Sequence, residues 1–405
     1  MKTSFLYYAI ACVVLGTALN VHAESRARAK SMIVIFNPDT PFQRYRAEAR
    51  EDERQLNDPA AWAYLNRGVV AAVQRLEKPL NFRATHVYSH AVHGFAAELT
   101  PEQVEALKKE AIVSYVEDDQ LMRAMASTLP WGVERVEADL SSTAAADGHA
   151  SVEGVHAYVI DTGISRRPDL NLVEHVSFIS GRNTDCNGHG THVASTLGAR
   201  EDRSQGGVAP GVPLHGVKVL DCDGFGLNSV VIKGVDWVTA NAVRPAVANM
   251  SLGGGMSRAL DTAVLRSIAG GVFYALAAGN EGRDACQSSP ARVGRNANGV
   301  ENGAVATGAV DGRRSPTSFS NFGDCVDMWS SDMRLPRRPE DGPLAHIRGT
   351  SMATPHTAGG AALYLASNPA ATPAQVEAAL RKRAARASPG SEAGRSDDLL
   401  QLERF

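Results

Sequence analysis

Gly349-Thr350-Ser351-Met352-Ala353-Thr354-Pro355-His356 is the stretch from which the organisation of this chain can be worked out. It places a serine among small residues, at a point where a loop is expected to become a helix. A serine in that position has an exposed hydroxyl, a helix N-terminus behind it and room for a substrate backbone to approach. The octapeptide alone suggests a nucleophile, and two upstream segments supply the partners that such a nucleophile needs.

A carboxylate and a histidine stand upstream of this serine. Asp161 follows an apolar run at residues 155–160 and precedes a glycine turn, so its side chain can face a cleft. His189 lies between two glycines, which leave its imidazole uncovered. Each has a plainer interpretation: Asp161 as a residue that starts a turn, and His189 with His192 as a metal pair. No glutamate accompanies that pair in a zinc-protease pattern. The chain order Asp161, His189, Ser351 is that of subtilisin, not of chymotrypsin or the α/β-hydrolases.

Five motifs in order along the chain resemble those of the subtilisin-type serine endopeptidases, in the branch of proteinase K and aqualysin. The motifs are Tyr158-Val159-Ile160-Asp161-Thr162-Gly163-Ile164, Asn187 to Ala194, Ala248-Asn249-Met250-Ser251-Leu252-Gly253-Gly254-Gly255, Ala277-Ala278-Gly279-Asn280-Glu281 and Gly349 to Ala358. The resemblance implies an enzyme that cuts peptide bonds in protein or peptide substrates. It also implies that catalysis needs no cofactor.

The resemblance assigns a role to each residue of the expected catalytic set. Ser351 would attack the scissile carbonyl, and His189 would take its proton and then donate it to the leaving amine. Asp161 would hold the imidazole in the required tautomer. Asn280 matches the oxyanion-hole asparagine of the family, with the backbone N–H of Ser351 as the second donor.

The substrate cleft is also implied by resemblance. Two stretches match the walls of the primary specificity pocket and two glycines match the opposite wall: Ser251, Leu252, Gly253, Ala277, Ala278 and Gly279, with Gly224 and Gly226 opposite. Glycines there leave backbone groups free to pair with an extended substrate. These walls contain no acidic residue, so we expect a large apolar or aromatic residue on the N-terminal side of the cut bond, with broad tolerance.

Four of the five cysteines lie outside the expected signal segment: Cys186, Cys222, Cys286 and Cys325. An even number in an exported chain predicts two disulfides, although four cysteines allow three pairings. Closeness in sequence favours Cys186 with Cys222 and Cys286 with Cys325, and the resemblance to aqualysin implies the same pairs. Zinc is the competing interpretation, but the chain lacks a Cys-x-x-Cys motif.

Structural calcium is a further expectation from the family, whose members often bind it through carboxylates and loop carbonyls. Asp327 matches one such carboxylate position. The loop at residues 290–309, which usually supplies the carbonyl partners, is longer here than in relatives. Residues 328–331 also replace a Pro-Gly turn.

Three parts are expected along the chain. Residues 1–23 resemble a secretory signal, with Lys2 before an apolar run that is shorter than the roughly 20 residues of a membrane span. Residues 24–123 follow a β-α-β-α-β pattern whose middle strand can split at Gly94, which predicts a small ferredoxin-like α+β domain. That part resembles the inhibitor-like propeptide of the family, which would fill the cleft of its own enzyme until a cut between about Arg123 and Ser127.

Residues 124–405 form the expected catalytic domain, an α/β fold. Apolar strands at 155–160, 214–220, 246–250 and 272–277 alternate with helices at 230–240 and 260–269, which predicts a mostly parallel sheet between two layers of helices. The net charge of −3 gives no reason to expect nucleic acid or an anionic membrane as partner. We expect a secreted monomer, extracellular or periplasmic, without a membrane segment in its mature form. Residues 381–396, polar and basic, are expected on the surface.

Two other classes of function fit the sequence less well. A pseudoprotease would be missing a residue of the catalytic set or the oxyanion hole, and none is missing. An esterase on an α/β-hydrolase fold predicts Gly-x-Ser-x-Gly, whereas position 353 is alanine and the chain order differs.

Overall fold

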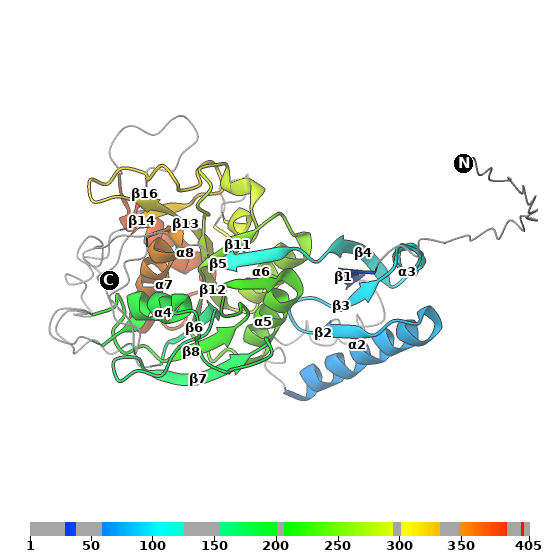
Figure 1. The fold of residues 1–405 in the computed structure, drawn as a ribbon. Helices are drawn as coiled ribbons and strands as arrows, with labels where there is room; N and C mark the ends of the chain where they lie inside the picture. The colour runs from blue at the N-terminus through cyan, green and yellow to red at the C-terminus, as the bar shows by residue number, and fades with distance from the viewer. Residues whose placement is uncertain are drawn as a thin grey trace, which may run out of the picture.

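The computed structural model describes residues 29–37, 59–124, 152, 154–200, 206–294, 301–332, 348–386 and 398–400. They form a small N-terminal domain and a larger domain, joined by a strand that runs from one into the other (Figure 1). The signal-like segment and most of the expected processing region lie outside the described residues. No helix of the described part is long and apolar enough to span a membrane.

The small domain has the predicted ferredoxin-like order. Its elements are β1 (Lys30–Phe36), α2 (Pro59–Leu80), β2 (Ala84–Tyr88), β3 (Gly94–Leu99), α3 (Pro101–Leu107) and β4 (Val113–Asp118). The antiparallel sheet has the order β2-β3-β1-β4, and the middle strand splits before Gly94 as predicted. A Cβ atom at Gly94 would lie 2.1 Å from the carbonyl oxygen of Val34, so the sheet requires glycine there.

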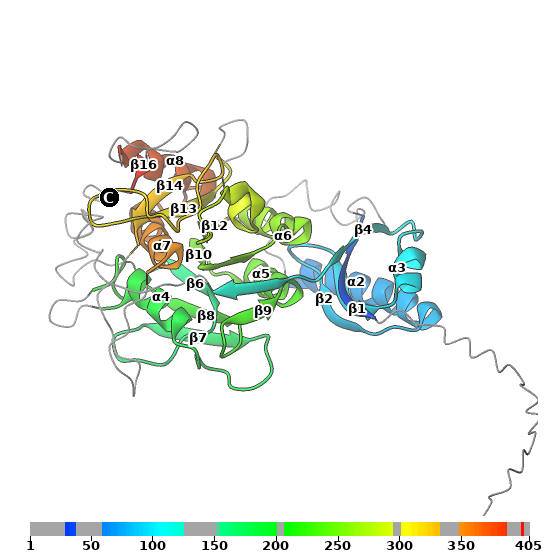
Figure 2. The ribbon, with the colours of Figure 1, turned by 45° about the horizontal axis from the view of Figure 1, so that its top comes forward.

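Alternate side chains of β1 face two different cores. Val34 and Phe36 pack with α2 and α3, whereas Ile33 and Ile35 pack with buried residues of the larger domain. One face of the small sheet therefore packs on its own helices, and the other is docked on the larger domain (Figure 2).

A nine-stranded sheet forms the centre of the larger domain, in the order β15-β16-β14-β13-β12-β10-β6-β8-β7. From β7 to β14 all neighbours are parallel, as predicted. The strands are β6 (His156–Asp161), β7 (Leu172–Ser177), β8 (Leu214–Lys218), β10 (Ala246–Met250), β12 (Val272–Ala277), β13 (Ala304–Val310), β14 (Met328–Ser331), β15 (Ala385–Arg386) and β16 (Asp398–Leu399).

Helices cover both faces of this sheet, which gives the predicted three layers. On one face lie α4 (His189–Gly198), α7 (Thr350–Ser367) and α8 (Pro373–Arg383); on the other lie α5 (Asn228–Asn241) and α6 (Arg258–Ala269). The strands are apolar on both sides because both faces are buried. In β6, Val159 packs with α4 and α7, and its neighbour Tyr158 packs with α5 and α6.

A third, small sheet was not predicted. Its strands are β5 (Leu121–Ala124), β9 (Phe225–Leu227) and β11 (Leu252–Gly254), with β5 in the middle and antiparallel to both neighbours. β5 continues the chain of the small domain into the larger domain (Figure 2), where it lies between β9 and β11.

Both predicted disulfides are present. Cys186 is bonded to Cys222 and Cys286 to Cys325, across 36 and 39 residues. The expectation that Arg381 lies on the surface is wrong. Arg381 is in the last turn of α8, and its side chain contacts two buried carboxylates.

Candidate active site

Parallel strands and helix N-termini bring the predicted site residues to one edge of the sheet. Asp161 ends β6, Ser251 directly follows β10, and Asn280 comes three residues after β12. His189 and Ser351 occupy the first turns of α4 and α7, which pack together on one face. Helices that return between parallel strands begin at the carboxyl edge of the sheet, so all five residues meet there.

Asp161 and His189 form a buried hydrogen-bonded pair. His189 Nδ1 lies 2.7 Å from Asp161 Oδ1, and the two residues are 3% and 0% exposed. The same carboxylate oxygen accepts the backbone N–H of Thr162. Gly190 permits this approach, since a Cβ atom there would lie 2.2 Å from the carbonyl oxygen of Gly163. The pair fixes which imidazole nitrogen faces the carboxylate and therefore which one faces the cleft.

Asp185 holds the loop that carries His189, a role that the sequence did not indicate. Its Oδ1 accepts the Thr162 hydroxyl and the N–H groups of Asn187 and Gly188, at 2.9, 3.0 and 2.8 Å. Its Oδ2 accepts the N–H and the hydroxyl of Thr191. Thr162 Oγ1 in turn accepts the N–H of Gly190 at 2.8 Å. The residue after Asp161 and the residues around His189 are thus joined through one carboxylate.

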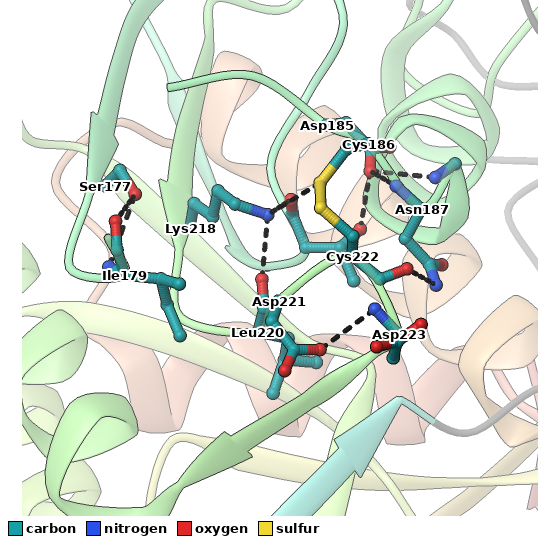
Figure 3. Close-up of a disulfide and its surroundings, with 12 residues drawn as sticks. Ser177, Ile179, Asp185, Cys186, Asn187, Lys218, Leu220, Asp221, Cys222 and Asp223 are labelled. Carbon is teal, nitrogen blue, oxygen red and sulfur yellow. Dashed lines mark hydrogen bonds between the residues drawn. A yellow bond between two sulfur atoms is a disulfide. The ribbon is translucent and has the colours of Figure 1, made fainter. Parts of the chain in front are cut away.

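Lys218, the last residue of β8, connects the end of β6 with the segment after β8, beside the Cys186–Cys222 disulfide (Figure 3). Its Nζ donates to the carbonyls of Thr162 and Leu220, at 2.7 and 2.9 Å, and lies 3.7 Å from Cys186 Sγ. Burial lowers the pKa of this amine. The Cys186–Cys222 disulfide beside it keeps the His189 loop close to the end of β8, and Asn187 Nδ2 donates to the carbonyl of Cys222.

Ser351 and Ser251 are connected in both directions. The Ser351 hydroxyl donates to the carbonyl of Ser251 at 3.0 Å, and the Ser251 hydroxyl donates to the carbonyl of Ser351 at 2.8 Å. Both residues are fully buried in this full-length chain. The nucleophile candidate is therefore tied to the first residue after β10, which is the start of one wall of the predicted cleft.

Asn280 presents its amide N–H₂ into the site. Its Oδ1 accepts the N–H and the hydroxyl of Thr350, at 2.9 and 3.0 Å, which fixes the orientation of the amide. Its Nδ2 is buried and has no hydrogen-bond partner among the described residues. Gly279 donates its N–H to the same Thr350 hydroxyl at 3.2 Å. An unused buried donor beside the first turn of α7 is the arrangement expected of an oxyanion site.

The predicted cleft walls are the strands that flank β5. In the register, Met122 lies opposite Gly226 and Gly254, and Arg123 lies opposite Phe225 and Gly253. Met122 is fully buried, and a Cβ atom at Gly254 would lie 2.6 Å from its sulfur. Gly224 forms the turn that leads into β9. Buried residues Ala277 and Ala278 continue from β12 toward Asn280. The predicted cleft walls therefore flank an extended segment of the same chain.

Asp327 does not fit the calcium expectation. Its carboxylate is fully buried, its Oδ2 accepts the N–H of Ala306 at 2.8 Å, and its Oδ1 lies 2.6 Å from Nη2 of Arg381. In the described part of the chain there is no group of three or more His, Cys, Asp or Glu residues that could hold a metal ion. Asp327 is thus a buried carboxylate, as expected of a calcium ligand, but the cation that contacts it is the guanidinium of Arg381.

A second buried ion pair, between Asp332 and Arg348, lies next to the residues that lead into Ser351. Asp332 is fully buried, and its Oδ2 accepts a hydrogen bond from Nε of Arg348 at 2.7 Å. Its backbone carbonyl accepts the N–H of Gly349. Burial raises the pKa of Asp332 to about 6, against the opposing effect of Arg348. The pair therefore anchors the start of the segment that leads into Ser351.

Comparison with known proteins agrees with this geometry. The profile of the subtilase family matches residues 153–398, more than half of the chain. The chain belongs to the subtilase family. The profile named peptidase inhibitor I9 matches residues 33–125, which include the small domain and β5. The chain is thus a serine endopeptidase with an inhibitor-type propeptide.

Three similar proteins each match more than half of the chain. The extracellular serine proteinase of a Thermus strain is 45% identical over 74% of this chain and 72% of its own length. The alkaline serine exoprotease A of Vibrio alginolyticus is 42% identical over 81% of this chain and 62% of its own. The crystal structure of a cold-adapted subtilisin-like serine proteinase, 45% identical, superposes with a TM-score of 0.56 over 62% of this chain and 89% of that one.

Replacing Asp185 by Asn tests whether its carboxylate positions the Asp161–His189 pair. The substitution turns an acceptor into a donor beside Thr191, so the loop around His189 should shift. We expect kcat to fall about 10- to 100-fold with KM changed little, since small displacements of catalytic groups are costly. Steady-state kinetics on a peptide substrate measures this. Asp324→Asn, at an exposed position, is the control and should keep full activity.

The raised pKa of Asp332 predicts a pH dependence of stability. The ordinary value is 3.8, so between pH 3.8 and about 6 the folded chain keeps a proton that the unfolded chain releases. The contribution of this group to stability is greatest below that window and declines as the pH rises through it. In chains carrying Ser351→Ala to prevent digestion, chemical denaturation at several pH values should show this decline. Asp332→Asn should make it smaller, and the part due to Asp261, whose pKa burial also raises to about 6, should remain. An unchanged pH slope in that variant would contradict the assignment.

Proposed function

We propose that the chain is a secreted endopeptidase that acts through Asp161, His189 and Ser351. The Ser351 hydroxyl would turn from the carbonyl of Ser251 toward His189, which would accept its proton as the oxygen attacks the scissile carbonyl. Asp161 would stabilise the protonated imidazole through the bond to Nδ1. The close, buried contact of Asp161 with His189 supports these roles.

Asn280 would stabilise the negative charge that develops on the carbonyl oxygen. Its Nδ2 would donate to the oxyanion together with the backbone N–H of Ser351, at the first turn of α7. The amide is already oriented by Thr350 before a substrate binds, so little reorganisation is needed during the reaction.

The pairing of β5 with both neighbouring strands is the main support for this proposal. A peptide strand pairs there on both edges, with β9 and with β11, in the way an extended substrate would. Substrate residues would pair with Gly253 on one side and Gly226 on the other. Ser251, Leu252 and Gly253, with Ala277, Ala278 and Gly279, would form the pocket for a large apolar or aromatic residue, and Gly224 would border the opposite wall.

Three carboxylates support a role for the N-terminal domain as an inhibitor of its own enzyme. Asp119 accepts the N–H of Ser229 in the first turn of α5, and Glu117 accepts the N–H of Ala259 in the first turn of α6. Both negative charges are placed favourably at helix N-termini. From the enzyme side, Asp236 accepts N–H groups of His90 and Ala91, each at 2.7 Å.

The register of β5 indicates where the precursor would be cut. Ala124 lies opposite Leu252. If the register continued one residue beyond each strand, residue 125 would lie opposite Ser251, whose carbonyl contacts the Ser351 hydroxyl. We therefore propose Met125–Ala126 as the bond that Ser351 first cleaves, within the interval predicted from the sequence. The mature enzyme would then be a monomer, exported by residues 1–23, and residues 24–125 would be its propeptide.

Asn280→Ala should lower kcat by about 100- to 1000-fold while KM stays nearly constant, because the lost donor acts mainly in the transition state. Kinetics of the mature enzyme on an apolar peptide substrate gives the two constants. The exposed Asn368→Ala is the matched control. A loss below about tenfold would exclude Asn280 as a main oxyanion donor.

Ser351→Ala should leave the precursor at full length, whereas the parent chain, produced without any other protease, should mature to an N-terminus at Ala126. Mass spectrometry of both purified proteins reads the result, and Ser367→Ala, at the far end of the same helix, should mature normally. Maturation of the Ser351→Ala chain would rule out self-cleavage. A different N-terminus in the parent would refute only the proposed bond.

A further inference from the structure

Arg381 lies where the calcium expectation placed a metal cation. Its Nη2 is 2.6 Å from Asp327 Oδ1, and its Nε is 3.2 Å from Glu377 Oε1 on the same helix. Both carboxylates are buried, at 0% and 1% exposure. One guanidinium therefore bridges two buried carboxylates, one on α8 and one at the start of β14.

The remaining oxygens around this cluster are also occupied by donors. Glu377 Oε2 accepts the N–H groups of Asn302 and Gly303, at 2.8 and 2.9 Å. Asp327 Oδ2 accepts the N–H of Ala306 in β13. In each carboxylate, one oxygen thus contacts Arg381, and the other accepts backbone N–H groups at or just before β13.

The nearby loop carbonyls are held by a side chain of the protein as well. Asn302 Nδ2 donates to the carbonyl of Val293 at 2.7 Å and lies 3.4 Å from that of Gly294. This loop lies directly against the carboxylate, since a Cβ atom at Gly294 would be 2.4 Å from Asp327 Oδ2. Calcium needs six to eight oxygen ligands at about 2.3–2.6 Å. Here the carboxylate and carbonyl oxygens face N–H donors instead.

We propose that Arg381, assisted by Asn302, replaces a bound metal ion as the cation of this site. The guanidinium balances Asp327 and Glu377 and fastens α8 to β13 and β14. A cation supplied by the chain itself is always present, so stability at this site does not depend on the concentration of free metal. Asp327 then does not bind calcium, and α8 is a structural part of the larger domain.

The test uses full-length chains that carry Ser351→Ala, so its outcome is independent of the catalytic proposal and free of digestion. Calorimetry measures the melting temperature of the catalytic domain for the parent, Arg381→Met, Asp327→Asn and Lys382→Met. Each is measured in excess calcium and in EDTA. Lys382 is exposed on the same helix and is the matched control.

We expect Arg381→Met to lower the melting temperature by roughly 10 °C, because it leaves two buried carboxylates without their cation. Lys382→Met should change it by no more than about 2 °C. The difference in melting temperature between calcium and EDTA should be the same in the parent and in Asp327→Asn, since any calcium bound elsewhere contributes equally to both.

Two results would overturn the proposal. One is a calcium-dependent shift in the parent that Asp327→Asn reduces, because Asp327 would then bind calcium. The other is a loss in Arg381→Met no larger than in Lys382→Met, because Arg381 would then not hold the helix. If Asp327→Asn does not fold, Arg381→Lys takes its place. Lysine keeps the charge but does not span both carboxylates, so it should melt below Lys382→Met, and equal melting temperatures would contradict the bridge.

Discussion

The arrangement depends on one constraint: parallel strands that are covered by helices on both faces all end at the same edge of the sheet. β6, β10 and β12 deliver Asp161, Ser251 and Asn280 to that edge, and α4 and α7 begin there with His189 and Ser351. Residues separated by up to 190 positions in sequence (161 to 351) are thereby brought to one edge of the sheet. Helix N-termini at this edge also favour the negative charge that forms during acyl transfer.

Fixed polar contacts behind this edge support the reactive groups. Asp185, Thr162 and Lys218 connect the end of β6 with the loop before α4, and Thr350 connects Asn280 with the start of α7. Such supports lose little entropy during the reaction because their partners are in place before substrate binds. In the precursor, β5 pairs with β9 and β11 where we propose that a substrate strand binds, so the same backbone groups would serve for inhibition, for maturation and for substrate binding.

Much of this architecture could be predicted from the sequence, since local patterns determine it. The apolar runs of β6, β10 and β12 and the Thr100–Gln103 capping box before α3 identify their elements directly. The motif around Ser351 and its order after Asp161 and His189 indicate the family. The disulfides follow because each pair is close in sequence and four cysteines allow few arrangements.

The contacts that were missed are non-local. Asp185 looks like a surface loop residue until folding brings Thr162 to it, and Lys218 looks like an exposed cation in an apolar strand. Arg381 was expected on the surface because its neighbours are polar, and only the packing of α8 against β13 and β14 shows its buried partners. Likewise, β5 has no strand-like sequence of its own, and its structure comes from β9 and β11 on either side.

Labelling with a fluorophosphonate tests the central claim most directly, namely that this edge of the sheet activates Ser351. Mature enzyme is treated with the reagent, digested and analysed by mass spectrometry, in parallel with a His189→Ala variant that has been processed in trans by the parent enzyme. We expect a covalent adduct on Ser351 in the parent and a much slower reaction in His189→Ala. An adduct on another residue, or equal labelling rates at Ser351 in both proteins, would contradict it.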